Sequence, residues 1–132
     1  MEKYEKLLNM LMDFNKAIRF AAVSNSQGEI LWHSQREGIR NIVPFEETKQ
    51  TIMRSINAWN ENFRVKEHVG SGLYSISSYE KIKRITVPLG NGDILFVTVN
   101  NDPLTKTKAK SYGHIVEMGK ILSIVDFIKS QK

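Results

Sequence analysis

The sequence contains no cysteine, and this absence removes several kinds of chemistry at once. Without Cys among its 132 residues, the chain has no disulfide, no thiolate nucleophile and no zinc–thiolate site. Disulfide frameworks are typical of secreted proteins. We therefore expect a cytoplasmic protein that is held together by an ordinary apolar core.

Long apolar runs are missing as well. No stretch approaches the roughly 20 apolar residues that cross a bilayer, so we expect no membrane span. Residues 1–14 mix acidic and basic side chains. They lack the long apolar run and the small-residue cleavage site of a signal peptide, which argues against such a segment.

The chain is also poor in groupings that carry catalysis or hold a cofactor. Its three histidines, His33, His68 and His114, are far apart, and none has a second His or an acid at close ligand spacing. Residues 70–74 hold two glycines around a serine but lack the Lys and the trailing helix of a phosphate-binding loop. No Gly-x-Ser-x-Gly nucleophile elbow is present. We expect no enzymatic activity, no metal and no cofactor.

What the chain does contain fits a single domain over residues 1–132. The hydrophobic fraction is 41% and the charged fraction is 25%, and both values are ordinary for folded proteins. A chain of this length buries a core without the help of disulfides or metals.

Three stretches have the apolar spacing of amphipathic helices. They cover residues 2–15, a segment from Pro44 to about residue 64, and a last segment that begins at Asp102-Pro103, with proline at a first helical position in the latter two. The predicted apolar stripes are Tyr4, Leu7, Leu8, Leu11 and Phe14 in the first, Phe45, Ile52, Ile56, Trp59 and Phe63 in the second, and Ile115, Gly119, Leu122, Val125 and Ile128, widened by Ile121 and Ile124, in the third.

Five runs rich in β-forming residues are predicted strands: 17–24, 29–34, 73–79, 81–88 and 93–99. Residues 25–28 join the first two as a loop in which Gly28 supplies a positive φ. Asn91-Gly92 between the last two favours a type I′ turn. Residues 94–97 are apolar on both faces, so we expect the last strand in the centre of the sheet.

The order helix, two strands, helix, three strands, helix predicts an α+β domain. Its sheet is expected to be antiparallel and five-stranded, with helices on both faces. No linker, internal repeat or low-complexity segment divides it.

This order of elements resembles the roadblock / dynein-light-chain domain, a member of the profilin-like and PAS-like group of folds. The stretch IRFAAVSNSQGEIL, residues 18–31, is similar to the first hairpin of that family. The stretch DILFVTVNNDPL, residues 93–104, followed by a long amphipathic helix, is similar to its closing strand and helix. The whole chain also resembles short archaeal proteins.

The resemblance implies a strand order of 2-1-5-4-3, with the second helix on one face and the first and third helices on the other. Pro88 must then fall at a strand terminus. The resemblance also implies a non-catalytic scaffold that pairs with itself through the second helix and the third strand, and that binds a small GTPase or another signalling protein. On this chain the partner surface corresponds to Phe45, Lys49, Met53, Trp59 and Tyr74.

A PAS-like small-molecule sensor is the first alternative function. Such a sensor needs a cavity between the sheet and the helices. Its expected lining is apolar and comes from elements that should converge, at Phe20, Trp32, Phe96 and Ile115.

Nucleic-acid binding is the second alternative, because the net charge of +5 is uneven along the chain. Residues 1–69 carry 10 basic and 9 acidic side chains, whereas residues 70–132 carry 9 and 5. A basic surface suits phosphate contacts or simply solubility. The chain lacks the interleaved aromatic residues of single-strand binders, so we expect no binding of consequence. The patch would consist of Lys81, Lys83, Arg84, Lys106 and Lys110.

Overall fold

The computed structural model describes residues 2–37, 45–62, 66–100 and 109–131, with the backbone alone for residues 45, 62, 66 and 109–117. Every predicted helix and strand is present. In chain order the elements are α1 (Glu2–Phe14), β1 (Ile18–Ser24), β2 (Ile30–Gln35), α2 (Phe45–Asn62), α3 (Lys66–Val69), β3 (Ser75–Ser78), β4 (Ile82–Pro88), β5 (Ile94–Asn100) and α4 (Ala109–Lys129).

Two elements differ from the sequence prediction. The four-residue helix α3 was not foreseen, because so short a segment shows no apolar period. Strand β3 is four residues long, shorter than the predicted 73–79. The predicted start of the last helix, at residues 102–103, lies outside the described residues.

The strands form one antiparallel sheet in the order β2-β1-β5-β4-β3, which confirms the predicted α+β fold class and topology. Strand β5 lies in the centre, as its two apolar faces predicted, and residues 94–97 are buried. Pro88 is the last residue of β4, a place where its missing N–H costs no ladder hydrogen bond.

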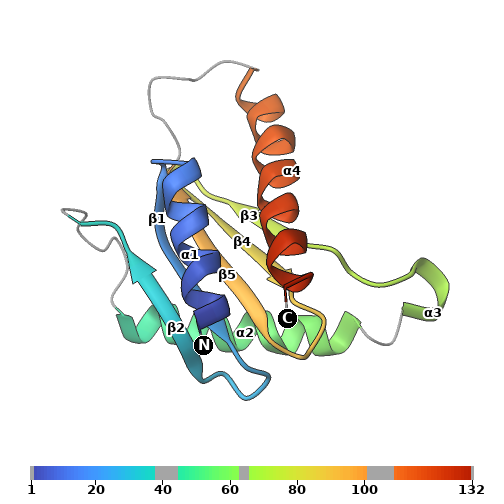
Figure 1. The fold of residues 1–132 in the computed structure, drawn as a ribbon. Coiled ribbons are helices and arrows are strands. Elements are labelled where there is room, and N and C mark those ends of the chain that lie inside the picture. Colours follow the sequence, from blue (N-terminus) through green and yellow to red (C-terminus); the bar gives the residue numbers. More distant parts are fainter. Residues whose placement is uncertain (1, 38–44, 63–65, 101–108, 132) are drawn as a thin grey trace.

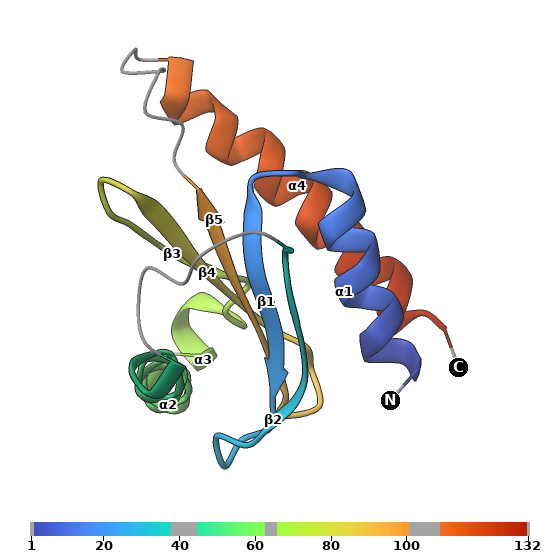
Figure 2. The same ribbon diagram turned by 90° about the vertical axis from the view of Figure 1, so that its left-hand side faces the viewer.

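Helices cover both faces of this sheet. Figure 1 shows α1 and α4 in front of the strands and α2 behind them, and the side view in Figure 2 shows the same two layers edge-on. Helix α2 crosses the strands near the end that carries the β1–β2 and β4–β5 turns (Figure 1). Helix α2 does not cover the opposite end of that sheet face (Figure 1).

The larger core cluster lies between the sheet and the helices α1 and α4. Helix α1 contributes Leu7, Leu8 and Leu11, the centre of its predicted stripe, with Tyr4 and Phe14 packed at the margin. Helix α4 contributes a stripe at spacings of three and four: Met118, Ile121, Val125 and Ile128. Burial of each such side chain stabilises the fold by about 1.5–3 kcal/mol.

The predicted α4 stripe was wrong at one position. Gly119 is exposed, whereas Met118 beside it is buried. The buried stripe therefore passes through Met118 at this turn, whereas Ile121, Val125 and Ile128 are buried as predicted. Leu122 is only partly buried.

A smaller cluster lies under α2, on the other face of the sheet. Ile52 and Ile56 are buried and face the strands, as predicted, and Trp59 packs at the edge of the cluster. The strand residues of this cluster are Phe20, Ala22, Ile94 and Phe96. The side chains of Phe45 and Phe63 lie outside the described residues.

The structure confirms the prediction for the first hairpin turn and corrects the prediction for the second. Gly28 has φ +88°, and the Asn25 side chain accepts hydrogen bonds from the backbone N–H groups of Gln27 and Glu29, so the first turn is as predicted. The type I′ prediction for Asn91-Gly92 is wrong. Positive φ values occur at Gly90 and Gly92 and not at Asn91, because the loop has three residues and closes where the Leu89 N–H donates to the Asp93 carbonyl.

None of the helices in the described part of the chain combines the length and apolar character that crossing a membrane requires.

Candidate interaction surface

Metal ligands do not come together among the residues that the structure describes. In that part of the chain, no group of three His, Asp or Glu side chains could hold a metal ion. His33 is exposed on β2 and stacks on Phe20, with ring centroids 6.1 Å apart, and His68 is exposed on α3. The His114 side chain lies outside the described part.

Two of the predicted partner-surface residues are exposed on α2. Lys49 is exposed, and its Nζ lies 3.8 Å from Glu46 Oε1 one turn earlier. Met53 is 38% exposed. Its sulfur lies against Gly28, where an added Cβ would approach to 1.9 Å. These exposed α2 residues are therefore partly charged and partly apolar, and Met53 makes an apolar contact with the β1–β2 turn.

Trp59 joins α2 to the sheet and to the segment that follows the helix. Its indole Nε1 donates a hydrogen bond to Thr86 Oγ1 at 3.0 Å. Gly72 crosses the ring so closely that an added Cβ would lie 2.2 Å from Cζ3. Trp59 is thus largely a packing residue that supports the surface, and only part of the ring is accessible.

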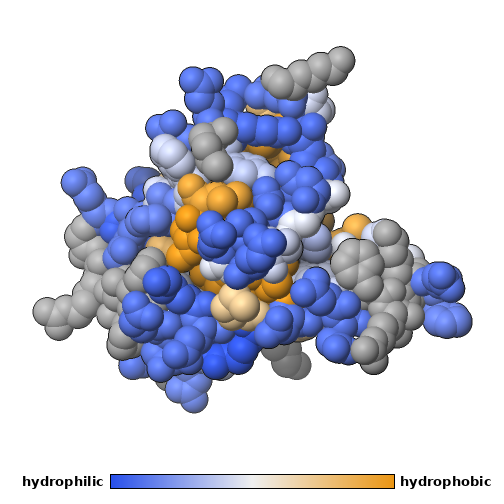
Figure 3. All heavy atoms as spheres, turned by 90° about the horizontal axis from the view of Figure 1, so that it is seen from below, coloured by the Kyte–Doolittle hydropathy of each residue, from blue (hydrophilic) through white to orange (hydrophobic). Residues whose placement is uncertain are grey.

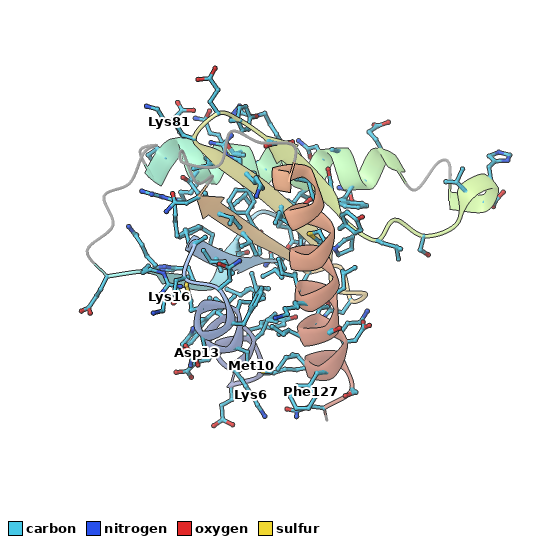
Figure 4. The ribbon with its side chains drawn as sticks, turned by 90° about the horizontal axis from the view of Figure 1, so that it is seen from above. Lys6, Met10, Asp13, Lys16, Lys81 and Phe127 are labelled. Carbon is cyan, nitrogen blue, oxygen red and sulfur yellow. The ribbon has the colours of Figure 1, made fainter. Side chains whose placement is uncertain are left out.

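Residues 67–74, which we call the arm, carry several of the exposed large apolar side chains of the described chain. Figure 1 shows α3 and the following stretch standing to one side of the sheet, and Figure 4, the view from above, agrees. Val69 is 76% exposed, Leu73 is 67% exposed and Tyr74 is 43% exposed. Water-exposed apolar side chains gathered in this way are typical of protein interfaces.

Val69 and Leu73 were not identified from the sequence as interface residues. The available signal was their position: two apolar residues flank Gly70-Ser71-Gly72, where a loop would ordinarily be polar. Tyr74 was identified, and it lies at the junction of the arm with β3.

The β3 strand adds an open sheet edge to the arm. Apart from Ile76, its side chains are small and exposed, and among the described strands it pairs only with β4. The backbone N–H and C=O groups on its other side are available for a further strand. We call the arm, the exposed α2 residues Lys49 and Met53, and this edge the α2–arm surface.

Figure 3 shows the end of the molecule beside α2, seen from below. Hydrophobic residues come to the surface in the middle of this view, and hydrophilic residues surround them. The arm lies to one side of this patch, as the position of α3 in Figure 1 shows.

The predicted basic patch is not one continuous face. Lys81 is exposed in the turn before β4, whereas Lys83 is only 8% exposed. Lys83 pairs across the sheet with Val99 and therefore lies on the α1–α4 side, opposite Arg84. Lys106 and the side chain of Lys110 lie outside the described residues.

The residues expected to line a sensor cavity do not converge, which corrects that prediction. Phe20 and Phe96 pack together under α2, whereas Trp32 packs against the cluster on the opposite face. Alternation along the strands separates the two groups by the thickness of the sheet. The Ile115 side chain lies outside the described part.

Comparison with solved structures identifies relatives of this arrangement. MglB, a gliding protein from Thermus thermophilus, aligns with a TM-score of 0.67 at 12% identity, over 99% of this chain and 91% of that one. A Roadblock/LC7 domain from Streptomyces avermitilis gives 0.58 at 11%, over 92% of each chain. An MglB with a tetrameric arrangement gives 0.62 at 12%, over 96% and 90%.

The chain has a roadblock-like fold. The family resemblance seen in the sequence is thereby confirmed for the fold. No family model and no curated protein matches the sequence. Since a roadblock-like fold does not by itself define a function, the function has to be argued from the α2–arm surface.

Proposed function

We propose that this protein is a non-catalytic interaction module that assembles with itself through the α2–arm surface. The assembled form then presents a platform to a signalling partner, with a small GTPase as the class that the roadblock resemblance suggests. The single observation that carries the proposal is the exposure of Val69, Leu73 and Tyr74 on the arm, beside α2 and the open edge of β3.

The chemistry of the surface supports self-assembly over catalysis. Val69 and Leu73 offer only apolar contact, and removal of such side chains from water drives association in proportion to the area buried. The open β3 edge offers backbone hydrogen bonds to a second copy of the same strand, and a twofold axis lets both copies use the same residues.

The structural relatives fit the same proposal. One solved MglB with this fold has a tetrameric arrangement, so the fold is compatible with assembly. The GTPase class rests on the family resemblance, and the cytoplasmic location and the resemblance to archaeal proteins stay predictions.

The proposal is tested by the mass of the protein in solution. The double variant Val69→Ser, Leu73→Ser removes the exposed apolar contacts without touching either core cluster. Light scattering on an eluting size-exclusion peak should show a dimer for the wild type and a monomer for the double variant at the same concentration.

Phe127→Ser provides the matched control. Phe127 is another exposed large apolar residue, but it lies on α4 beside Lys6, on the opposite layer (Figure 4). The control should stay dimeric. A monomeric wild type would contradict self-assembly, and a dimer that survives in the double variant would place the interface elsewhere.

A further inference from the structure

A cross-strand row of polar side chains occupies the α2 side of the sheet beyond α2 itself. Ser77 of β3 lies directly opposite Arg84 of β4, and Arg84 lies opposite Thr98 of β5. Directly opposed residues of antiparallel strands project from the same face, about 4.5–5.5 Å apart at Cβ. We call these three residues the polar row.

The polar row differs from the adjacent row because α2 does not cover it. One step along the strands, Ser75, Thr86 and Phe96 are opposed in the same way. There Thr86 and Phe96 are buried, and Thr86 accepts the hydrogen bond from Trp59 of α2. In the polar row Ser77 is exposed, and Arg84 and Thr98 are partly exposed. The polar row is therefore open to a solute.

Arg84 is held in place by an aromatic ring. Its guanidinium carbon lies 5.3 Å from the ring centroid of Tyr79, which is 55% exposed. Stacking of this kind covers one flat face of the guanidinium, and the N–H groups at its edge can still donate hydrogen bonds. A pre-oriented arginine loses less conformational entropy when it binds an anion.

A second arginine is fixed close to the polar row. Arg19 Nη1 donates a hydrogen bond to Asn100 Oδ1 at 2.6 Å. Asn100 is two residues beyond Thr98 on β5, so both side chains project from the same face of the sheet. Thr98 thus lies between the strand positions that carry the two guanidinium groups.

The surrounding charge has the sign that attracts an anion. Figure 4 shows Lys16 and Lys81 at turns of this same end of the molecule, and both are exposed. The described acidic residues near these cations in sequence are Asp13, Glu37 and Glu80. Asp13 lies in the last turn of α1, which covers the other face of the sheet, and none of the three belongs to the polar row. An excess of cations over acids raises the local concentration of anions.

We propose that the polar row binds a phosphate group, as the dianion of a phosphate monoester or of free phosphate. The guanidinium edge of Arg84 supplies paired N–H donors that match two phosphate oxygens. The hydroxyls of Ser77 and Thr98 supply neutral donors on either side, and Arg19 supplies a second positive charge. Ser77 lies on β3, whose edge belongs to the α2–arm surface, whereas Arg84, Thr98 and Arg19 lie on inner strands. The charged part of the site therefore does not require dimerisation.

The test is a titration of the 15N-labelled protein with inorganic phosphate, followed by amide chemical shifts. The expected shifts are at Ser77, Arg84 and Thr98, and sodium chloride at equal ionic strength should not reproduce them. Parallel titrations with phosphoserine and with adenosine monophosphate identify the source of the group. Equal affinity for all three indicates recognition of phosphate alone, and tighter binding of either ester indicates that ester class.

Two variants and one control complete the test. Arg84→Ala should weaken phosphate binding by about tenfold or more, the usual effect of losing a charged hydrogen bond. Ser77→Ala, at an exposed edge position that the fold tolerates, should weaken it by a smaller factor. Arg54→Ala removes the same charge from the exposed side of α2 and should leave binding unchanged. Absence of phosphate-specific shifts in the wild type, or equal weakening by Arg54→Ala and Arg84→Ala, would overturn the proposal.

Discussion

Arg36 follows β2 in a connector with little periodic signal, yet its guanidinium closes the C-terminal end of α1. It donates hydrogen bonds to the backbone carbonyls of Met12, Asn15 and Ile18 at 2.9–3.0 Å. The last carbonyls of a helix lack partners within the helix, so one side chain completes the α1–β1 turn. This basic residue therefore has a structural role.

Replacement of Arg36 by Ala should lower the free energy of unfolding by about 2–3 kcal/mol, because partly buried carbonyls lose charged donors. Arg36→Lys should recover only part of this loss, since an ammonium group cannot reach three carbonyls as a planar fork does. Urea denaturation measures both variants. Arg54→Ala, an exposed arginine on α2, should change the value by at most about 0.5 kcal/mol. Equal stability of Arg36→Ala and wild type would contradict the capping role.

Tyr4 ties the start of α1 to the β4–β5 turn. Its hydroxyl donates to the Asp93 carboxylate and accepts a hydrogen bond from Asn91 Nδ2. The pKa of the Tyr4 phenol is raised, and burial is the largest cause. The hydrogen bond from Asn91 lowers this pKa, whereas the hydrogen bond to Asp93 and the charge of Asp93 raise it further.

A raised pKa means that folding favours the protonated phenol. The stabilisation by Tyr4 is complete below the pKa of the unfolded chain, about 10, and is lost as the pH rises through the higher pKa of the folded state. The free energy of unfolding should therefore fall more steeply above about pH 10 in the wild type than in Tyr4→Phe. Urea midpoints across this range measure the slopes. Parallel slopes in the two proteins would refute the assignment.

Among the elements, α2 and the arm depend on a contact that only glycine allows. A Cβ at Gly72 would lie 2.2 Å from Trp59 Cζ3, whereas nothing lies within 4 Å of a Cβ at Gly119 on α4. The two positions form a matched pair for the same substitution.

Gly72→Ala should destabilise the protein by about 1–3 kcal/mol, the usual cost of overpacking, and should change the tryptophan fluorescence as the indole moves. Gly119→Ala should stabilise it by about 1 kcal/mol, because alanine is the better helix former and meets no neighbour. Thermal unfolding followed by circular dichroism distinguishes the two signs. A stabilising Gly72→Ala would show that the arm does not pack on Trp59.

The elements that could be predicted from the sequence are those whose burial repeats along the chain. The apolar stripe of α1 and the two apolar faces of β5 each consist of several residues in contact with a core. An error at one residue therefore does not change the predicted element. The arm has no such repeat, because its apolar residues contact solvent. Strand β3 is shorter than predicted for the same reason: its side chains are mostly exposed, and only its pairing with β4 defines it.

For the whole molecule, the strand order followed from the family resemblance, whereas the candidate site required coordinates. Lys83 and Arg84 are adjacent in sequence, yet one is buried beneath α1 and α4 and the other lies in the open polar row. Similarly, Phe20 and Trp32 lie on opposite faces. Which face a strand residue takes depends on register, and register is fixed by contacts between distant segments.

Self-assembly is the central claim, and sedimentation equilibrium of the wild-type chain over a range of concentrations tests it most directly. One chain has a mass of 15.2 kDa. The α2–arm surface predicts that the weight-average mass rises towards twice that value, and that Val69→Ser, Leu73→Ser shifts the rise to higher concentration. A mass that stays at that of one chain throughout the range would contradict the account.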